Sequence, residues 1–159
     1  MAVNGALSCG ILLHRAGDTG IEVFLGHMGG PFWSKKDAGA WSIPKGEPMS
    51  GEAELDTALR EFAEEIGRPA PAADYRRLGE FRQKSGKVVV VFDAGIDEAG
   101  VDERVAFVSS NTFELEWPPR SGRIGSFPEI DRAEWMPLAA ATDRVVAGQR
   151  AMLDSLAAG

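Results

Sequence analysis

The sequence predicts an α/β fold in which a mixed β-sheet lies between helices, an α/β/α sandwich. Three observations lead to this prediction. Short apolar runs bounded by turn-forming residues open the chain, helical periodicity replaces them between residues 52 and 66, and another helical stretch closes the chain. With 159 residues, of which 44% are hydrophobic, the chain can bury one core, so we expect a single domain over residues 1–159.

The first part of the chain is expected to hold a hairpin, a loop and a short strand. Ala6 to His14 and Ile21 to His27 are apolar runs separated by turn-forming residues. Gly29 to Ala40 reads as a loop that is long enough to bind a ligand. Trp41 to Ile43 is then a brief strand, which Pro44 stops.

The stretch from Glu52 to Ile66 is the best-supported helix. It contains no proline, and Gly67 is placed to end it. The apolar residues that recur at helical spacing are Leu55, Leu59, Phe62 and Ile66.

The second part of the chain is expected to contain a second hairpin, more strands and a closing helix. The hairpin joins Arg77 to Gln83 with Lys87 to Asp93. A loop is expected from Trp117 to Gly122. The remaining predicted elements are strand material at Val105 to Val108 and Phe113 to Trp117, a strand at Ala133 to Met136, and a helix at Thr142 to Leu156.

Charge and composition exclude several kinds of partner. A net charge of −7 argues against a nucleic-acid polymer or an anionic membrane as the main partner. The N-terminus lacks a basic stretch followed by a long apolar one, and no window is long and apolar enough to span a bilayer, so we expect a cytoplasmic protein. The single cysteine, Cys9, excludes an internal disulfide and is expected to be a buried hydrophobe. His14 and His27 are expected to end strands without catalytic duty.

The predicted helix carries an acidic face. On a wheel of about 100° per residue, Glu64 and Glu65 lie about 60° and 40° to either side of Glu61, while the apolar stripe lies elsewhere. Like charges at this spacing destabilise a helix unless a cation neutralises them, and carboxylates suit Mg²⁺ or Mn²⁺. The alternative interpretation is a solvated acidic face. A bridging metal would also let an acidic protein bind an anionic substrate.

The surrounding spacing favours the metal site. From Gly46 to Gly67 the chain reads G-x5-E-x7-R-E-U-x-E-E-x-G, where U is apolar, and this pattern resembles the Nudix box. One departure is Arg68, where the family has an apolar residue; we expect it to alter packing only. The resemblance implies that Glu61, Glu64 and Glu65 ligate Mg²⁺, that the Gly46 carbonyl assists, and that Glu52 and Arg60 form a structural ion pair. Asp56, four residues before Arg60, is a competing partner for it.

The resemblance to Nudix hydrolases implies hydrolysis of a phosphoric anhydride bond in a nucleoside diphosphate linked to another group. The lead-in from Trp41 to Gly46 resembles the W-x-x-P-K-G segment of the branch that includes diadenosine polyphosphate hydrolases. A nucleoside triphosphate or a dinucleoside polyphosphate is therefore the expected substrate, with the enzyme a monomer or homodimer. The alternative is an inactive Nudix-fold module that senses a nucleotide, which the intact glutamates disfavour. Isomerase chemistry on an isoprenoid diphosphate would need a cysteine and glutamate pair, for which Cys9 is poorly suited.

Residues outside the box are expected to hold the rest of the substrate. Glu129 is a further carboxylate that could reach the metal from another loop. Trp41 and Trp135 are assigned to the core. Aromatic candidates for stacking on a base are Phe32, Trp33 and Trp117. Cationic candidates for the phosphates are Lys45, Arg82, Lys84, Lys87, Arg120 and Arg123.

Overall fold

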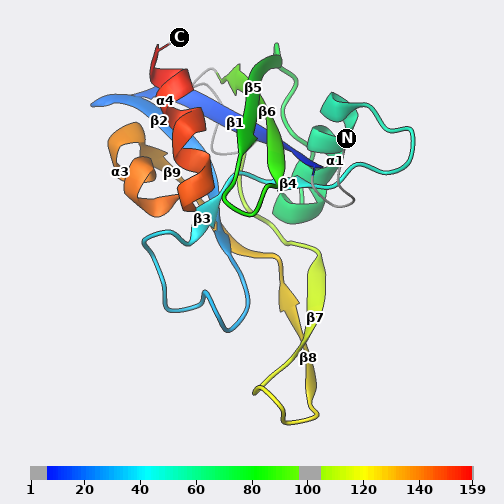
Figure 1. The fold of residues 1–159 in the computed structure, drawn as a ribbon. Helices are drawn as coiled ribbons and strands as arrows, with labels where there is room; N and C mark the ends of the chain where they lie inside the picture. Colours follow the sequence, from blue (N-terminus) through cyan, green and yellow to red (C-terminus); the bar gives the residue numbers. More distant parts are fainter. Residues whose placement is uncertain (1–6, 97–104, 159) are drawn as a thin grey trace.

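A mixed sheet with helices on both faces forms the body of the protein in the computed structural model, which describes residues 7–96 and 105–158 (Figure 1). Two long strands, β1 (Leu7–Gly17) and β2 (Gly20–Met28), form the predicted hairpin at its centre. The predicted first residue of that hairpin, Ala6, lies outside the described residues. The other strands are β3 (Trp41–Ser42), β4 (Lys45–Gly46), β5 (Arg76–Arg82), β6 (Val88–Gly95) and β9 (Ile130–Pro137).

The sheet order is β3-β2-β1-β6-β5, with β4 also paired to β1 and β9 to β2. The pairing of β1 with β6 is parallel, and the other pairings are antiparallel, so the sheet is mixed as expected. Among the described residues, none of the helices is long and apolar enough to cross a lipid bilayer.

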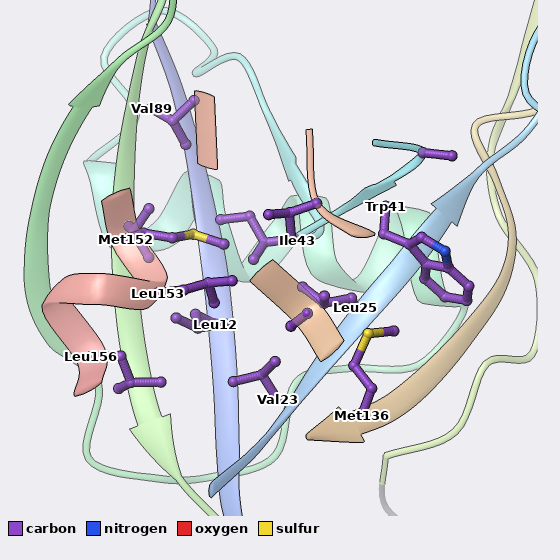
Figure 2. Packing of buried hydrophobic residues seen from close by; sticks show 14 residues of the cluster. Leu12, Val23, Leu25, Trp41, Ile43, Val89, Met136, Met152, Leu153 and Leu156 are labelled. Atoms are coloured by element: carbon purple, nitrogen blue, oxygen red, sulfur yellow. The ribbon is translucent and has the colours of Figure 1, made fainter. Parts of the chain in front are cut away.

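Alternate residues of β1 serve the two faces of the sheet, because successive side chains of a strand point to opposite sides. Leu12 faces the helices α3 (Leu138–Arg144) and α4 (Arg150–Ala158), and Figure 2 shows this cluster, with Met152 and Leu153 against Leu12. Cys9, buried as predicted, and Ile11 face the opposite side, where the helix α1 (Glu54–Ile66) supplies Phe62. Both helical layers are therefore held by apolar burial.

Helix α1 confirms the strongest sequence prediction and begins two residues later than expected. Gly67 ends it in the left-handed conformation, with φ 87°, and its N–H donates to the Ala63 carbonyl. Glu52 lies before the helix because its N–H donates to the Met49 carbonyl, while its carboxylate accepts from Met49 N–H and from the Thr57 hydroxyl. The Glu52 side chain thus braces the loop that enters the helix.

A two-stranded arm projects from the body (Figure 1). It pairs β7 (Thr112–Glu116) with β8 (Ile124–Pro128), and the predicted loop from Trp117 to Gly122 is its tip. Strand β8 was not predicted, because Ile124 to Pro128 is short and contains a glycine and a proline. The prediction of strand material at Val105 to Val108 was wrong: the Val108 and Ser109 N–H groups donate to the Ile66 carbonyl at the end of α1, so this backbone joins no sheet.

The prediction of one closing helix from Thr142 to Leu156 was also wrong. Helix α3 ends at Arg144, and Val145 is extended at φ −68° and ψ 153°; a 3-10 turn, η1 (Ala147–Gln149), precedes α4. Val145 forms a bridge with Trp41, and the Val146 N–H donates to the Trp41 carbonyl at 2.9 Å. Pairing with β3 therefore overrides helical propensity at these two β-branched residues.

Candidate active site

Helix α1 and strand β4 bring the predicted box residues together. Among the carboxylates, Glu61 is buried, Glu65 is half-buried, and Glu64 leaves 38% of its side chain exposed. The Lys45 N–H in β4 donates to Glu65 Oε1 at 3.2 Å, which joins the strand directly to the acidic face of the helix. Strand β4 is itself fixed by its pairing with Cys9 and Gly10 of β1.

Gly46 lies closely against the carboxyl group of Glu61. A Cβ atom at this position would come within 2.1 Å of Glu61 Cδ and 2.2 Å of Glu61 Oε2. Only glycine leaves room here for the carboxylate in its present position. The glycine of the box is therefore required by this contact, and its φ is not in the left-handed region.

Arg60 connects four groups around the acidic face. Its Nε and Nη2 donate to the two oxygens of Glu52, each at 2.9 Å, and Nη2 also donates to the Glu47 carbonyl. Its Nη1 donates to Glu61 at 2.9 Å and to Glu64 at 3.2 Å. Arg60 thus pairs with Glu52 as the family resemblance implies, rather than with the exposed Asp56.

The Glu52 pair carries a pH-dependent stability. Hydrogen bonds from Arg60, followed by that from the Met49 N–H, lower the pKa of Glu52 to about 2. A carboxylate whose pKa is lower in the folded state stabilises the fold above the unfolded pKa, and that contribution is lost as the pH falls through the folded pKa. We expect the melting temperature of Glu52→Gln to be lower than wild type at pH 7, and the difference to shrink between about pH 4.5 and pH 2. A difference that stays constant across an acid titration followed by circular dichroism would contradict this role.

Burial makes the negative charge of the acidic face costly. It raises the pKa of Glu65 to about 8, against the opposing effect of Lys45, and it raises the pKa of Glu61. Burial also lowers the pKa of Lys45. Carboxylates in this state gain from an added cation nearby.

The donor chemistry of this face fits a hard divalent cation. Glu61 and Glu64 already share one positively charged group, Arg60 Nη1, and their carboxylate oxygens are the ligands that Mg²⁺ and Mn²⁺ prefer. Over residues 7–96 and 105–158, however, no three side chains of His, Cys, Asp or Glu are arranged to enclose an ion. Glu65 is directed to Lys45 instead, so the three predicted ligands share a helix face without meeting at one point.

Two adjoining hollows lie beside this face. The smaller hollow, of about 120 Å³, is lined by Glu65, Lys45 and Glu129. Residues of the loop that follows β2 and of the two-stranded arm also line it. The larger, of about 350 Å³, shares Met28, Trp33, Ser42 and Lys45 with it. Beyond Lys45 the larger hollow is lined by Gln83, Lys84, Ser85, Val146, Ala147 and Gly148.

The structure brings some of the predicted substrate residues to these hollows. Trp33, Lys45, Lys84 and Glu129 line them, and the positive charge of Lys87 acts on Lys45. Glu129 is held there by its backbone, which accepts from Gly29 N–H and donates to the Asn111 carbonyl.

Other predicted substrate residues lie elsewhere. Arg82 is exposed and donates to the Gly86 carbonyl of its own turn. Arg120 and Arg123 lie at the tip of the arm, and Trp117 contacts Phe32 edge-on with ring centroids 5.1 Å apart. None of these five residues lines either hollow.

Sequence reasoning did not identify several residues that line the larger hollow. Gln83 and Ser85 belong to the turn between β5 and β6, while Val146 to Gly148 come from the break before α4. Their separation in sequence left no motif by which they could be grouped. The break in the closing helix, which was itself not predicted, is what places residues 146–148 at this position.

The two histidines have structural partners. His14 Nε2 lies 2.9 Å from Asp93, which Arg76 also binds. His27 is fully buried between Asp131 and the Lys36 carbonyl. Neither lines the hollows beside the acidic face, and the absence of a catalytic role stays a prediction.

Comparison with known proteins gives one family and several similar folds. A family model described as NUDIX domain matches residues 6–156. No curated protein matches the sequence.

Among solved structures, an Ap4A hydrolase binary complex from C. elegans is similar at 18% identity and TM-score 0.63, covering 95% of this chain and 96% of that one. The NUDIX domain of Shewanella oneidensis NrtR, complexed with ADP ribose, is similar at 17% identity and TM-score 0.60, covering 96% and 86%. The C-terminal domain of mouse MUTYH, in complex with human PCNA, is similar at 17% identity and TM-score 0.58, covering 96% and 87%.

Proposed function

Because this chain belongs to the Nudix hydrolase family, we propose that it is a divalent-metal-dependent pyrophosphohydrolase that cuts a phosphoric anhydride bond of a nucleotide. One observation carries this proposal. The carboxylates of Glu61, Glu64 and Glu65 lie on one helix face beside Gly46, and a hollow with Lys45 in its wall adjoins that face. This arrangement supports a role for the carboxylates in holding a cation and for Lys45 in binding phosphate.

Each group has a role in this scheme. Glu61, Glu64 and Glu65 would hold Mg²⁺ or Mn²⁺, and the ion would supply positive charge for the phosphate oxygens and lower the pKa of water. Arg60 keeps Glu61 and Glu64 oriented through Nη1. Lys45 offers a charged donor to a phosphate oxygen. One acidic side chain would accept a proton from the attacking water as the water oxygen bonds to phosphorus. The bond from that phosphorus to the bridging oxygen breaks, and the bridging oxygen leaves with the other phosphate group.

A nucleoside triphosphate or a dinucleoside polyphosphate is the substrate class that we favour. The W-x-x-P-K-G lead-in places Lys45 next to Gly46, and the C. elegans protein of similar fold is named as an Ap4A hydrolase. The second candidate is a module that senses a nucleotide without cutting it, which the similarity to the ADP-ribose complex of the NrtR domain favours. The complete set of box glutamates favours hydrolysis.

A nucleotide panel tests the proposal. Purified protein is incubated with nucleoside triphosphates, diadenosine tetraphosphate, ADP-ribose and a nucleotide sugar, with Mg²⁺, with Mn²⁺ and with excess chelator, and the products are separated by anion-exchange chromatography. We expect metal-dependent release of a nucleoside monophosphate or diphosphate from a triphosphate or a dinucleoside polyphosphate. Binding without turnover of any nucleotide would favour the sensing module, and turnover of ADP-ribose or the nucleotide sugar alone would overturn the substrate class.

A further inference from the structure

The larger hollow beyond Lys45, which we call the Trp33 recess, has the properties of a nucleoside site. It is lined by Met28, Trp33, Ser42, Lys45, Gln83, Lys84, Ser85, Val146, Ala147 and Gly148. Its volume of about 350 Å³ lies in the range of small-molecule sites. Because Trp33, Lys45, Met28 and Ser42 also line the smaller hollow next to Glu65, a ligand can extend from the acidic face into the recess.

The Trp33 side chain packs against the hydrophobic core, and backbone hydrogen bonds fix the loop that carries it. The Trp33 N–H donates to the Gly30 carbonyl, and the Trp33 carbonyl accepts from Lys36 N–H at 2.9 Å. The Lys36 carbonyl in turn lies 2.6 Å from Nε2 of the fully buried His27. An aromatic platform that is already ordered loses little conformational entropy when a flat ring stacks on it.

Trp33 is only half-buried, so part of its ring stays accessible in the recess that it lines. The Lys36 ammonium lies 5.3 Å from the ring centroid, and Lys36 lines neither hollow. Part of the indole is therefore open to a base that enters the recess.

The lining of the recess also provides polar groups. Gly148 has no side chain, and a Cβ there would lie 2.6 Å from Gln83 Cγ, so the glycine allows the Gln83 side chain to lie against the 3-10 turn. The Gln83 carboxamide can both donate and accept hydrogen bonds, as the edge of a nucleobase does. Lys84 adds positive charge to the rim.

We infer that the Trp33 recess binds the nucleoside of the nucleotide, with the base stacked on Trp33 and the phosphate chain passing Lys45 towards Glu65. This inference rests on the proposed function for its ligand class. Phe32 and Trp117 are the rival platform, but their rings are in edge-on contact with each other beside the arm and outside the recess.

The experiment measures binding without turnover. Isothermal titration calorimetry at fixed free Mg²⁺ compares α,β-methylene ADP, which carries a base, with methylenediphosphonate, which does not; neither probe contains a P–O–P bond. The variants are Trp33→Ala, Trp33→Phe, Phe32→Ala and Ala147→Leu; the last fills the recess from an exposed position on a different element. Ala139→Leu, at an exposed position of α3, is the matched control for added volume.

We expect Trp33→Ala to raise the Kd for α,β-methylene ADP about 5- to 150-fold, which corresponds to the usual 1 to 3 kcal/mol of a base–aromatic stack. Trp33→Phe should keep part of the affinity, and Ala147→Leu should weaken nucleotide binding. The Kd for methylenediphosphonate should change less than about twofold in all of them, because that probe makes no base contact. Ala139→Leu should match wild type with both probes.

Three results would overturn the inference: no nucleotide binding by wild type, equal losses for both probes, or a loss with Phe32→Ala but not with Trp33→Ala. If Trp33→Ala fails to fold, the inference is tested with Ala147→Leu, which should likewise weaken binding of the nucleotide probe and leave binding of the base-free probe unchanged. Selective loss of nucleotide binding in a protein that hydrolyses nothing in the panel would uphold the recess and reject the proposed hydrolysis. The two claims can therefore fail separately.

Discussion

Replacing Glu64 with glutamine is expected to lower kcat/KM by about two to four orders of magnitude while leaving the protein folded. Glutamine keeps the size of the side chain but removes the charge that a divalent cation requires. The structural cost is small, because 38% of the Glu64 side chain is exposed and its contact with Arg60 is an i,i+4 pair on a helix surface. Such pairs contribute about 0.3 to 0.5 kcal/mol.

The matched control for Glu64→Gln is Asp56→Asn. Asp56 is an exposed carboxylate of the same helix and lies about 140° around it from Glu61, so the control removes one negative charge away from the acidic face. Steady-state rates are measured with the best substrate of the panel, across a titration of Mg²⁺, and melting temperatures are recorded for both variants. Normal turnover by Glu64→Gln would show that Glu64 is not a metal ligand.

Gly46→Ala is expected to lower activity about a hundredfold or more by displacing Glu61, with a smaller effect on stability than on rate. A Cβ at residue 46 would come within 2.1 to 2.4 Å of the Glu61 carboxyl atoms, which is closer than atoms in contact can lie. The carboxyl group is the far end of a flexible side chain, so it can move while the backbone of β4 stays paired with β1. Its displacement removes it from the acidic face.

A double-mutant cycle distinguishes displacement of the Glu61 carboxylate from a general disturbance of the backbone around Gly46. If Gly46→Ala acts through Glu61, adding it to Glu61→Gln should cost little further activity, because the affected carboxylate is already gone. The measured quantities are kcat/KM and melting temperature for the two single variants and the double variant. Additive losses in kcat/KM would show that Gly46 acts independently of Glu61, and a melting temperature far below wild type for Gly46→Ala would show that the backbone had to shift.

Local patterns were sufficient for the elements whose stability depends on neighbours in sequence. The helical period of its apolar residues and the stop at Gly67 located α1 to within two residues at its start. Alternating and continuous apolar runs located β1, β2, β5 and β6. These signals are strong because the apolar face of each element must be buried whatever the details of its partner.

The elements that depended on distant partners were predicted poorly. Val145 and Val146 leave the helical conformation because Trp41, about a hundred residues earlier, offers them backbone pairing. Strand β8 forms by pairing with β7, and the backbone of Val108 and Ser109 lies at the end of α1 because the Ile66 carbonyl accepts their N–H groups. Propensity within a short window contains no information about such partners.

By itself, the sequence determined the fold class, because apolar runs and helical periods extend along the whole chain. It also determined the family and the glutamates of the acidic face, because a single helix and its flanking loop carry that spacing. Only the tertiary structure decided which cationic and aromatic side chains lie near these glutamates. It placed Trp33, Lys45 and Glu129 beside the helix and left Arg120, Arg123 and Trp117 on the arm. The reason is physical: a helix sets the relative positions of its own side chains, whereas a recess is made by strands, turns and loops that long-range packing brings together.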